Sequence, residues 1–173
     1  MTKHLWPKLR LKAETTEELK EKYKKIYIET YIQKPDGTKV KIYDWNGNRV
    51  RFNLHAFEHA FSESSNFRFK DGHHDIPLSK QRARCVLWIK EVLTGEKGTI
   101  EIYNQYRKDS RGRRKKNRVL LVVEENYLVV LEYRKKDNDM QFITAYPAYP
   151  QKIQKIKREG GWIETKSPSL SGD

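Results

Sequence analysis

Two histidines, His55 and His59, lie four residues apart in a segment that begins at the good helix-capping residue Asn53. On a helix, this spacing places both imidazoles on one face. Because imidazole titrates near neutral pH, either ring could take a proton from a ribose 2′-hydroxyl or give one to a leaving 5′-oxygen. A plain position on a helix surface is the alternative for each ring. The adjacent pair His73 and His74 lies in a polar loop and is weaker evidence for such chemistry.

Residues 55–59 also fit the H-x-x-E-H pattern, in which two histidines bind zinc and the glutamate, here Glu58, activates water. Such a zinc hydrolase needs a third ligand, and Glu91 is the acidic candidate on the later helix. The flanking regions are cationic, which suits a polyanion better than a peptide substrate. We therefore expect no metal and no cofactor, and we keep the zinc hydrolase as the less favoured alternative.

Arginine and hydroxyl side chains later in the chain suit a phosphodiester. Arg82 and Arg84 lie on the next predicted helix, and a guanidinium can donate two parallel hydrogen bonds to a phosphate. On the last predicted strand, Phe142, Thr144 and Tyr146 alternate onto one face, and Ile143 and Ala145 onto the other. A hydroxyl and a phenol there could hold a phosphate, and the ring could stack on a base. The candidate catalytic residues are therefore His55, His59, Arg82, Arg84, Thr144 and Tyr146.

The segment 105–118 carries eight basic residues and one acid, Asp109. So dense a positive charge predicts an unpacked loop that follows a phosphate backbone and binds it with a steep salt dependence. Tyr103, just before it, either stacks on bases or fills a sheet face. The candidate nucleic-acid-binding residues are Tyr103, Arg107, Lys108, Arg111, Arg113, Arg114, Lys115, Lys116 and Arg118.

The composition agrees with a polyanionic partner. Lys and Arg number 36 against 23 Asp and Glu, which gives a formal net charge of +13 and favours nucleic acid over an anionic membrane surface. The single cysteine, Cys85, excludes an internal disulfide framework and is expected to be a buried structural residue. No stretch is apolar enough to span a membrane, and the first residues lack the apolar segment of a signal peptide. We therefore expect a cytoplasmic protein with no membrane partner.

The 173 residues predict one domain with an appended arm. We expect a helix/hairpin extension over 1–50, a nuclease-like domain over 51–158 and a disordered tail over 159–173. Helices followed by a strand meander indicate an α+β layout. The predicted helices cover 15–25, 54–61, 79–94 and 151–158; the predicted strands cover 26–32, 40–42, 99–107, 118–124, 127–134 and 140–146.

From residue 55 to residue 147 the chain resembles the phage-type branch of the barnase–EndoU–colicin–RelE-like nuclease superfamily. The segments that carry the resemblance are 54–59, 82–84, 88–93, 127–131 and 143–147. The resemblance implies two helices packed on a four-stranded antiparallel sheet. It also implies a metal-independent ribonuclease, often a toxin or prophage protein, whose site gathers a histidine, an arginine, a threonine and a tyrosine. Those roles correspond to His55 or His59, Arg82 or Arg84, Thr144 and Tyr146.

The sequence thus predicts an RNA endonuclease in which a 2′-hydroxyl attacks the phosphate and leaves a 2′,3′-cyclic phosphate, with His55 slightly preferred over His59. The expected partners are a transfer, ribosomal or messenger RNA and an acidic antitoxin or immunity protein. A nucleic-acid-binding module without catalysis is the alternative, since it needs only the charge and the tyrosines.

Overall fold

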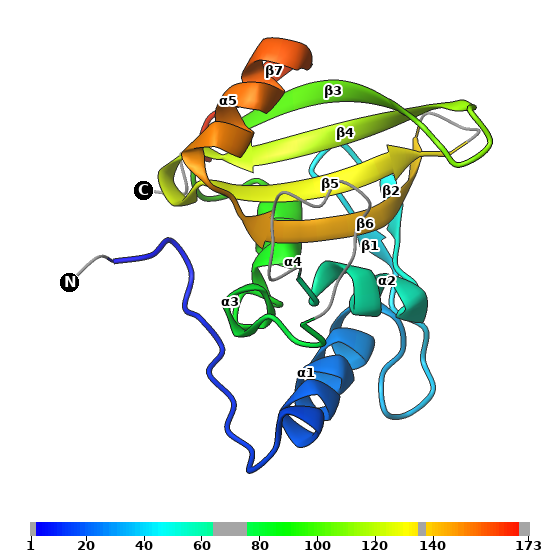
Figure 1. Ribbon diagram of the computed structural model, residues 1–173, viewed down its shortest axis with the longest axis vertical. Helices are drawn as coiled ribbons and strands as arrows, with labels where there is room; N and C mark the ends of the chain where they lie inside the picture. Colours follow the sequence, from blue (N-terminus) through cyan, green and yellow to red (C-terminus); the bar gives the residue numbers. More distant parts are fainter. Residues whose placement is uncertain (1–2, 64–75, 135–137, 170–173) are drawn as a thin grey trace.

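A curled seven-stranded sheet organises the protein in a computed structural model that describes residues 3–63, 76–134 and 138–169 (Figure 1). The strand order is β1-β2-β6-β5-β4-β3-β7, and β2–β6 is the parallel pair in an otherwise antiparallel sheet. The strands are β1 Ile42–Tyr43, β2 Arg49–Arg51, β3 Ile100–Lys108, β4 Arg114–Val122, β5 Tyr127–Tyr133, β6 Asp139–Pro147 and β7 Gly161–Lys166. The helices are α1 Thr16–Tyr31, α2 Leu54–Ala60, α3 Lys80–Ala83, α4 Trp88–Thr94 and α5 Pro150–Glu159.

The expected fold, two helices on a four-stranded antiparallel sheet, is wrong. The last four of the six predicted strands do form an antiparallel meander, β3 to β6, but β7 extends it at one edge and β2 and β1 extend it at the other. β1 and β2 have only two and three residues, too few to show the alternation that marks a strand. The tail expected to be disordered from 159 onward instead supplies β7, which pairs antiparallel with β3.

The sheet separates two hydrophobic cores. Helices α1 to α4 cover one face and α5 lies on the other (Figure 1). The larger core, between the sheet and α1 to α4, includes Phe57 and Phe61, whose ring centres are 5.0 Å apart. The smaller core, beneath α5, consists of Tyr103, Val119, Leu121, Leu128, Ile153 and Ile156. None of the helices in the described part is long and apolar enough to cross a membrane.

Helix α1 runs six residues beyond the predicted end, through the segment 26–31 that was expected to be a strand. Its buried residues follow one another at a spacing of four, so they form one stripe on the larger core: Leu19, Tyr23, Tyr27 and Tyr31. The Tyr31 hydroxyl donates to the Val86 carbonyl at 2.6 Å and accepts from the Lys90 amide at 3.1 Å. Helix α1, part of the predicted extension, therefore shares its core with the rest of the protein.

The single helix predicted over 79–94 is two helices, because a turn at 84–87 separates α3 from α4. Cys85 lies in this turn and is fully buried, as predicted, and burial raises its pKa to about 12. Gly95 ends α4 in the left-handed conformation with φ +67°, directly after residue 94, where the predicted helix also ends. A Cβ at Gly95 would lie 2.9 Å from the Trp45 ring, so the close packing of this end needs glycine.

A β-bulge in β6 divides the last predicted strand between the two faces of the sheet. Phe142 pairs with Leu131 and Thr144 pairs with Val130, so Ile143 is an extra residue. Phe142 packs in the larger core, whereas Tyr146 packs beside the smaller one. The expectation that Phe142, Thr144 and Tyr146 share one face, with Ile143 and Ala145 on the other, is therefore wrong. Beyond the bulge, Thr144 and Tyr146 face the α5 side.

Candidate active site

Helices α2 and α3 lie along the edge of β6 that no strand covers. β2 pairs with β6 only over residues 139–141, and both short helices contact β6. Asn53 caps α2 by accepting from the Ala56 amide, and Ser79 caps α3 by accepting from the Arg82 amide. Side chains from both helices can therefore pass this open edge and reach the face of the sheet on which α5 lies.

Four of the predicted catalytic residues line one hollow at this edge. The first hollow, of about 470 Å³, is lined by His59 from α2, Arg82 from α3, Thr144 and Tyr146 from β6, and Lys152 from α5. Gln105, Arg107 and Asn117 from the neighbouring strands β3 and β4 also line it. An imidazole, three cationic groups and two hydroxyl-bearing side chains thus meet at one place, although their segments are far apart in the sequence.

The other two predicted catalytic residues lie outside the first hollow. His55 is exposed on α2, and Arg84 lies in the turn after α3, where its carbonyl accepts from the Leu9 amide. The structure therefore favours His59 over His55, against our slight preference, and Arg82 over Arg84. His73 and His74 fall outside the described residues.

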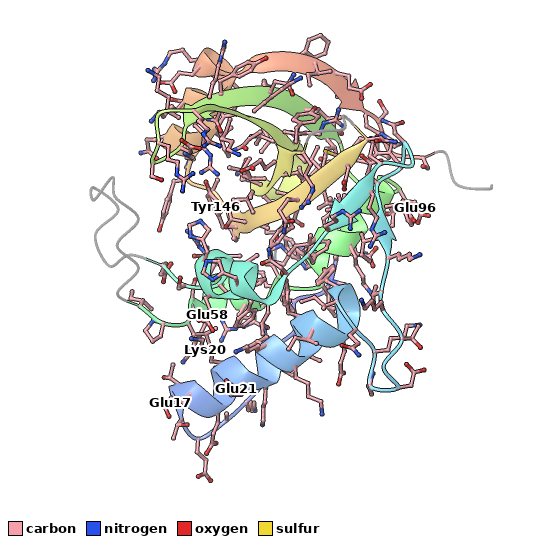
Figure 2. All side chains as sticks on the ribbon, turned by 90° about the vertical axis from the view of Figure 1, so that its right-hand side faces the viewer. Glu17, Lys20, Glu21, Glu58, Glu96 and Tyr146 are labelled. Carbon is pink, nitrogen blue, oxygen red and sulfur yellow. The ribbon has the colours of Figure 1, made fainter. Side chains whose placement is uncertain are left out.

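Glu58 of the H-x-x-E-H pattern is engaged by lysines of α1. Its carboxylate lies 2.5 Å from the Lys20 ammonium and 3.7 Å from that of Lys24. Figure 2 shows Glu58 and Lys20 between α2 and α1, while Tyr146 lies on the opposite side of α2, beside β6. Within the described ranges, no three potential metal ligands of the His, Cys, Asp and Glu types gather in one place.

Arg82 is a half-buried cation held against an aromatic ring. Its guanidinium lies 4.5 Å from the centre of the Tyr146 ring, and one nitrogen donates to the Ala60 carbonyl at 3.4 Å. Burial lowers the pKa of Arg82 and raises that of the Tyr146 phenol, so the phenol stays protonated and can donate a hydrogen bond. In the described part of the chain, no carboxylate lies within ion-pair distance of Arg82. A desolvated cation of this kind is suited to an anionic ligand.

Lys152 is a site residue that the sequence did not single out. It lies in the first turn of α5, and the pKa of its ammonium is lowered by burial and by the nearby Lys155. Two polar atoms on residues lining the first hollow, Asn117 Oδ1 and Thr144 Oγ1, are buried and have no hydrogen-bond partner among the described residues. The sequence did predict a helix over 151–158, which contains Lys152. It gave no indication of which face of that helix would lie against the site.

A second hollow adjoins the first. The second hollow, of about 580 Å³, shares Arg82, Tyr146 and Lys152 with the first. Its other lining residues are Glu63, Gln81, Pro147, Tyr149 and Gln151. The three shared side chains therefore lie between two neighbouring spaces.

The cationic segment expected to be an unpacked loop is instead a regular β-hairpin. β3 and β4 pair through Lys108 and Arg114, and the ends of both strands project beyond the rest of the sheet (Figure 1). At its turn, one oxygen of Asp109 accepts from the amides of Arg111 and Arg113 at 2.9 and 2.8 Å. The tip arginines are exposed, so this part of the predicted binding surface is accessible.

The remaining cations of the hairpin are divided between its two faces. Arg107 and Lys115 lie 3.4 and 3.6 Å from the carboxylate of Glu132. On the other face, Arg114 lies over the Tyr106 ring, Lys116 lies over the Tyr133 ring, and Arg118 donates to the Tyr133 hydroxyl.

Tyr103 of the predicted binding surface is only 5% exposed, because its ring packs in the smaller core. It is therefore not placed to stack on a base.

Comparisons of this chain with known protein families, with curated proteins and with solved structures found no match. The fold implied by the nuclease resemblance is also wrong, since the sheet has seven strands and mixed pairing. The function is therefore inferred from the geometry and chemistry of the two hollows.

Proposed function

We propose that this protein is a metal-independent RNA endonuclease whose active site is the first hollow. The observation that carries the proposal is the gathering of His59, Arg82, Thr144 and Lys152 around one space. These side chains come from three helices and a strand, and each has a role in cleaving a phosphodiester by internal attack.

In this mechanism the 2′-hydroxyl of the RNA attacks the adjacent phosphorus, and the bond from phosphorus to the 5′-oxygen breaks. His59 takes the proton from the 2′-hydroxyl as the general base. Lys152, in its ammonium form, gives a proton to the departing 5′-oxygen. The products are a 2′,3′-cyclic phosphate and a 5′-hydroxyl. The nucleophile is part of the substrate and already close, so positioning supplies much of the rate.

The phosphate in this mechanism is held by Arg82, Thr144 and Tyr146. The guanidinium of Arg82 is fixed by the Tyr146 ring and the Ala60 carbonyl, so it is oriented before substrate arrives. Extra negative charge develops on the phosphoryl oxygens in the transition state, and a fixed cation stabilises that charge. The β3–β4 hairpin, with Arg111 and Arg113 at its tip, would hold the flanking RNA backbone.

The test is cleavage of a defined RNA in the presence of a chelator, with the product ends identified. We expect 2′,3′-cyclic phosphate ends, loss of cleavage in His59→Ala, and retained cleavage in His55→Ala, the matched control from the same helix. A product with a 3′-hydroxyl end, or equal activity in the two variants, would contradict the mechanism.

A nucleic-acid-binding protein without catalysis is the second candidate, and the exposed cationic hairpin tip favours it. RNA binding that survives His59→Ala, with no turnover of transfer, ribosomal or messenger RNA by the unaltered protein, would establish it. We also propose the cytoplasm as the compartment, and an acidic antitoxin or immunity protein as a partner suited to a cationic site.

A further inference from the structure

We propose that Arg49, on β2, holds a second phosphate of the RNA, away from the bond that is cleaved. The inference rests on the proposed function, because both phosphates belong to the same RNA strand. It concerns a different part of the sheet from the first hollow, since β2 lies outside the meander β3 to β6. It can be tested with RNA that cannot be cleaved.

Arg49 and the first hollow lie on the same face of the sheet. Val50 and Met140 are buried in the larger core, so alternation directs their neighbours in β2 and β6 to the opposite face, on which α5 lies. These neighbours include Arg49, Arg51 and Gln141. Helix α5 covers one end of this face, and the β3–β4 hairpin extends from the other end (Figure 1).

A row of cross-strand neighbours connects the first hollow to β2. Asn117, which lines the first hollow, pairs with Glu132 of β5. Gln141 of β6 pairs with Glu132 on one side and with Arg51 of β2 on the other. The row spans three interstrand spacings of about 4.8 Å each, or about 14 Å along the sheet. A single-stranded RNA extended along this row would therefore bring a phosphate beyond the cleaved bond to β2.

Two carboxylates lie along or beside this row, and each is matched by two cations. Glu132 is paired with two cations of the β3–β4 hairpin, and Asp139 lies 2.8 Å from Arg51 and 3.6 Å from Arg134. Because the cations outnumber the carboxylates, this part of the face keeps a net positive charge. Arg49 adds to that excess.

Arg49 has no carboxylate partner within the described ranges. None of the ion pairs there includes its guanidinium. The guanidinium lies 5.8 Å from the centre of the Tyr43 ring, and its buried Nε–H has no acceptor among the described residues. A buried donor without an acceptor is costly, and a phosphate oxygen would satisfy both the donor and the charge.

Gln141 supplies a second free donor on the same face. Its Oε1 accepts from Arg134 at 3.2 Å, and its buried Nε2 has no acceptor among the described residues. Arg49 pairs with Asp139, two residues before Gln141 in β6, so the two donors belong to diagonal neighbours. A phosphodiester presents acceptor oxygens only, whereas base edges present donors as well. Two free donors beside an excess of positive charge therefore favour phosphate over a base.

The experiment combines a change in the protein with a change in the RNA. In a 2′-O-methyl oligonucleotide, which 2′-hydroxyl attack cannot cleave, one phosphodiester at a time is replaced by a neutral methylphosphonate, and affinity is measured by fluorescence anisotropy. For the unaltered protein, the replacement at the phosphate held by Arg49 should weaken binding about tenfold to 100-fold, the effect of one hydrogen bond to a charged group. The same replacement should have little effect on Arg49→Gln, because the contact is already lost.

Arg10→Gln is the matched control, since it removes the same charge from an exposed position in the segment that leads to α1. It should keep the full response to the neutral linkage, whereas the milder variant Arg49→Lys should reduce that response. The proposal is overturned if no linkage couples to Arg49, or if the coupled linkage is the one at which the ribose form of the same sequence is cleaved. It is also overturned if Arg49→Gln binds the all-phosphodiester strand as tightly as Arg10→Gln does.

The outcomes separate this inference from the proposed function. If one linkage couples to Arg49 but no RNA is cleaved, the phosphate site on β2 stands and the nuclease proposal fails. If RNA is cleaved and no linkage couples to Arg49, the nuclease proposal stands and the phosphate site on β2 is excluded.

Discussion

Replacing Arg82 by lysine keeps the positive charge and removes the planar fork, so it isolates what the guanidinium geometry contributes. A lysine cannot donate two parallel hydrogen bonds to a phosphate, nor lie flat on the Tyr146 ring. Loss of one preorganised donor to a developing oxyanion costs about 2.7–4 kcal/mol of transition-state stabilisation. We therefore expect kcat/KM for RNA cleavage to fall about 10²-fold to 10³-fold in Arg82→Lys.

The effect on stability should be much smaller. A partly desolvated cation–π contact, such as the one at 4.5 Å in this site, contributes about 1–2 kcal/mol. The expected change in Tm is about 2–4 °C for each kcal/mol in a protein of this size.

The assay compares Arg82→Lys with Arg84→Lys, which makes the same chemical change two residues away and outside the first hollow. A fluorogenic RNA gives kcat/KM in chelator, and a thermal melt gives Tm for each variant. We expect Arg84→Lys to cleave at close to the unaltered rate. Similar kcat/KM in the two variants, or a decrease of less than about threefold in Arg82→Lys, would refute a catalytic role for the guanidinium fork.

Further variants test the proposed acid, the hairpin and the core. Lys152→Ala should cleave ordinary RNA poorly but recover on RNA with a 5′-sulfur leaving group, which needs no proton; unrecovered cleavage would exclude Lys152 as the acid. Because burial lowers the pKa of Lys152, which must be protonated to act, cleavage by the unaltered protein should decline with rising pH earlier than an ordinary lysine would allow, and Lys152→Arg should shift that decline to higher pH. Replacing Arg111 and Arg113 together by alanine should reduce the slope of log affinity against log salt by about 0.7 for each phosphate that the hairpin no longer neutralises, and an unchanged slope would remove the hairpin tip from the RNA path. Tyr31→Phe should lower the free energy of unfolding by about 1–3 kcal/mol, since the backbone groups bonded to its hydroxyl lose their partner in the core, and denaturant titration would show whether it does.

The elements with a strong periodic pattern could be predicted from the sequence. The meander from β3 to β6 and the helix α5 occur close to the predicted ranges. The strand predicted over 40–42 overlaps β1 only at Ile42. β2 and β7 were not predicted, because β2 is very short and β7 is completed by a partner strand distant in the sequence. The predicted range of the first helix ended too early because the residues that follow it are rich in isoleucine and tyrosine. Such a run suits a strand and a buried helical stripe equally well.

The site was predictable by residue type but not by position. The sequence offered two histidines and two arginines for the same roles, and only packing of α2 and α3 against the open edge of β6 selects His59 and Arg82. Lys152 carried no pattern of its own, because its significance depends on which side of the sheet its segment meets. The cationic segment was predicted to be unpacked from its charge, but cross-strand rings and Glu132 compensate that charge in a regular hairpin.

The extra residue at Ile143 decides which way the end of β6 faces. If the same residues formed a regular strand, Thr144 would share the face of Phe142 and its hydroxyl would be directed at the hydrocarbon interior, and the methyl group of Ala145 would take its place at the phosphate. Deletion of Ile143, in contrast, would bring Thr144 directly after Phe142, so strict alternation would return with Thr144 and Tyr146 still on the α5 side. The site therefore depends on where the strand accommodates its surplus residue, because a shift of one position in a pleated strand exchanges its two faces.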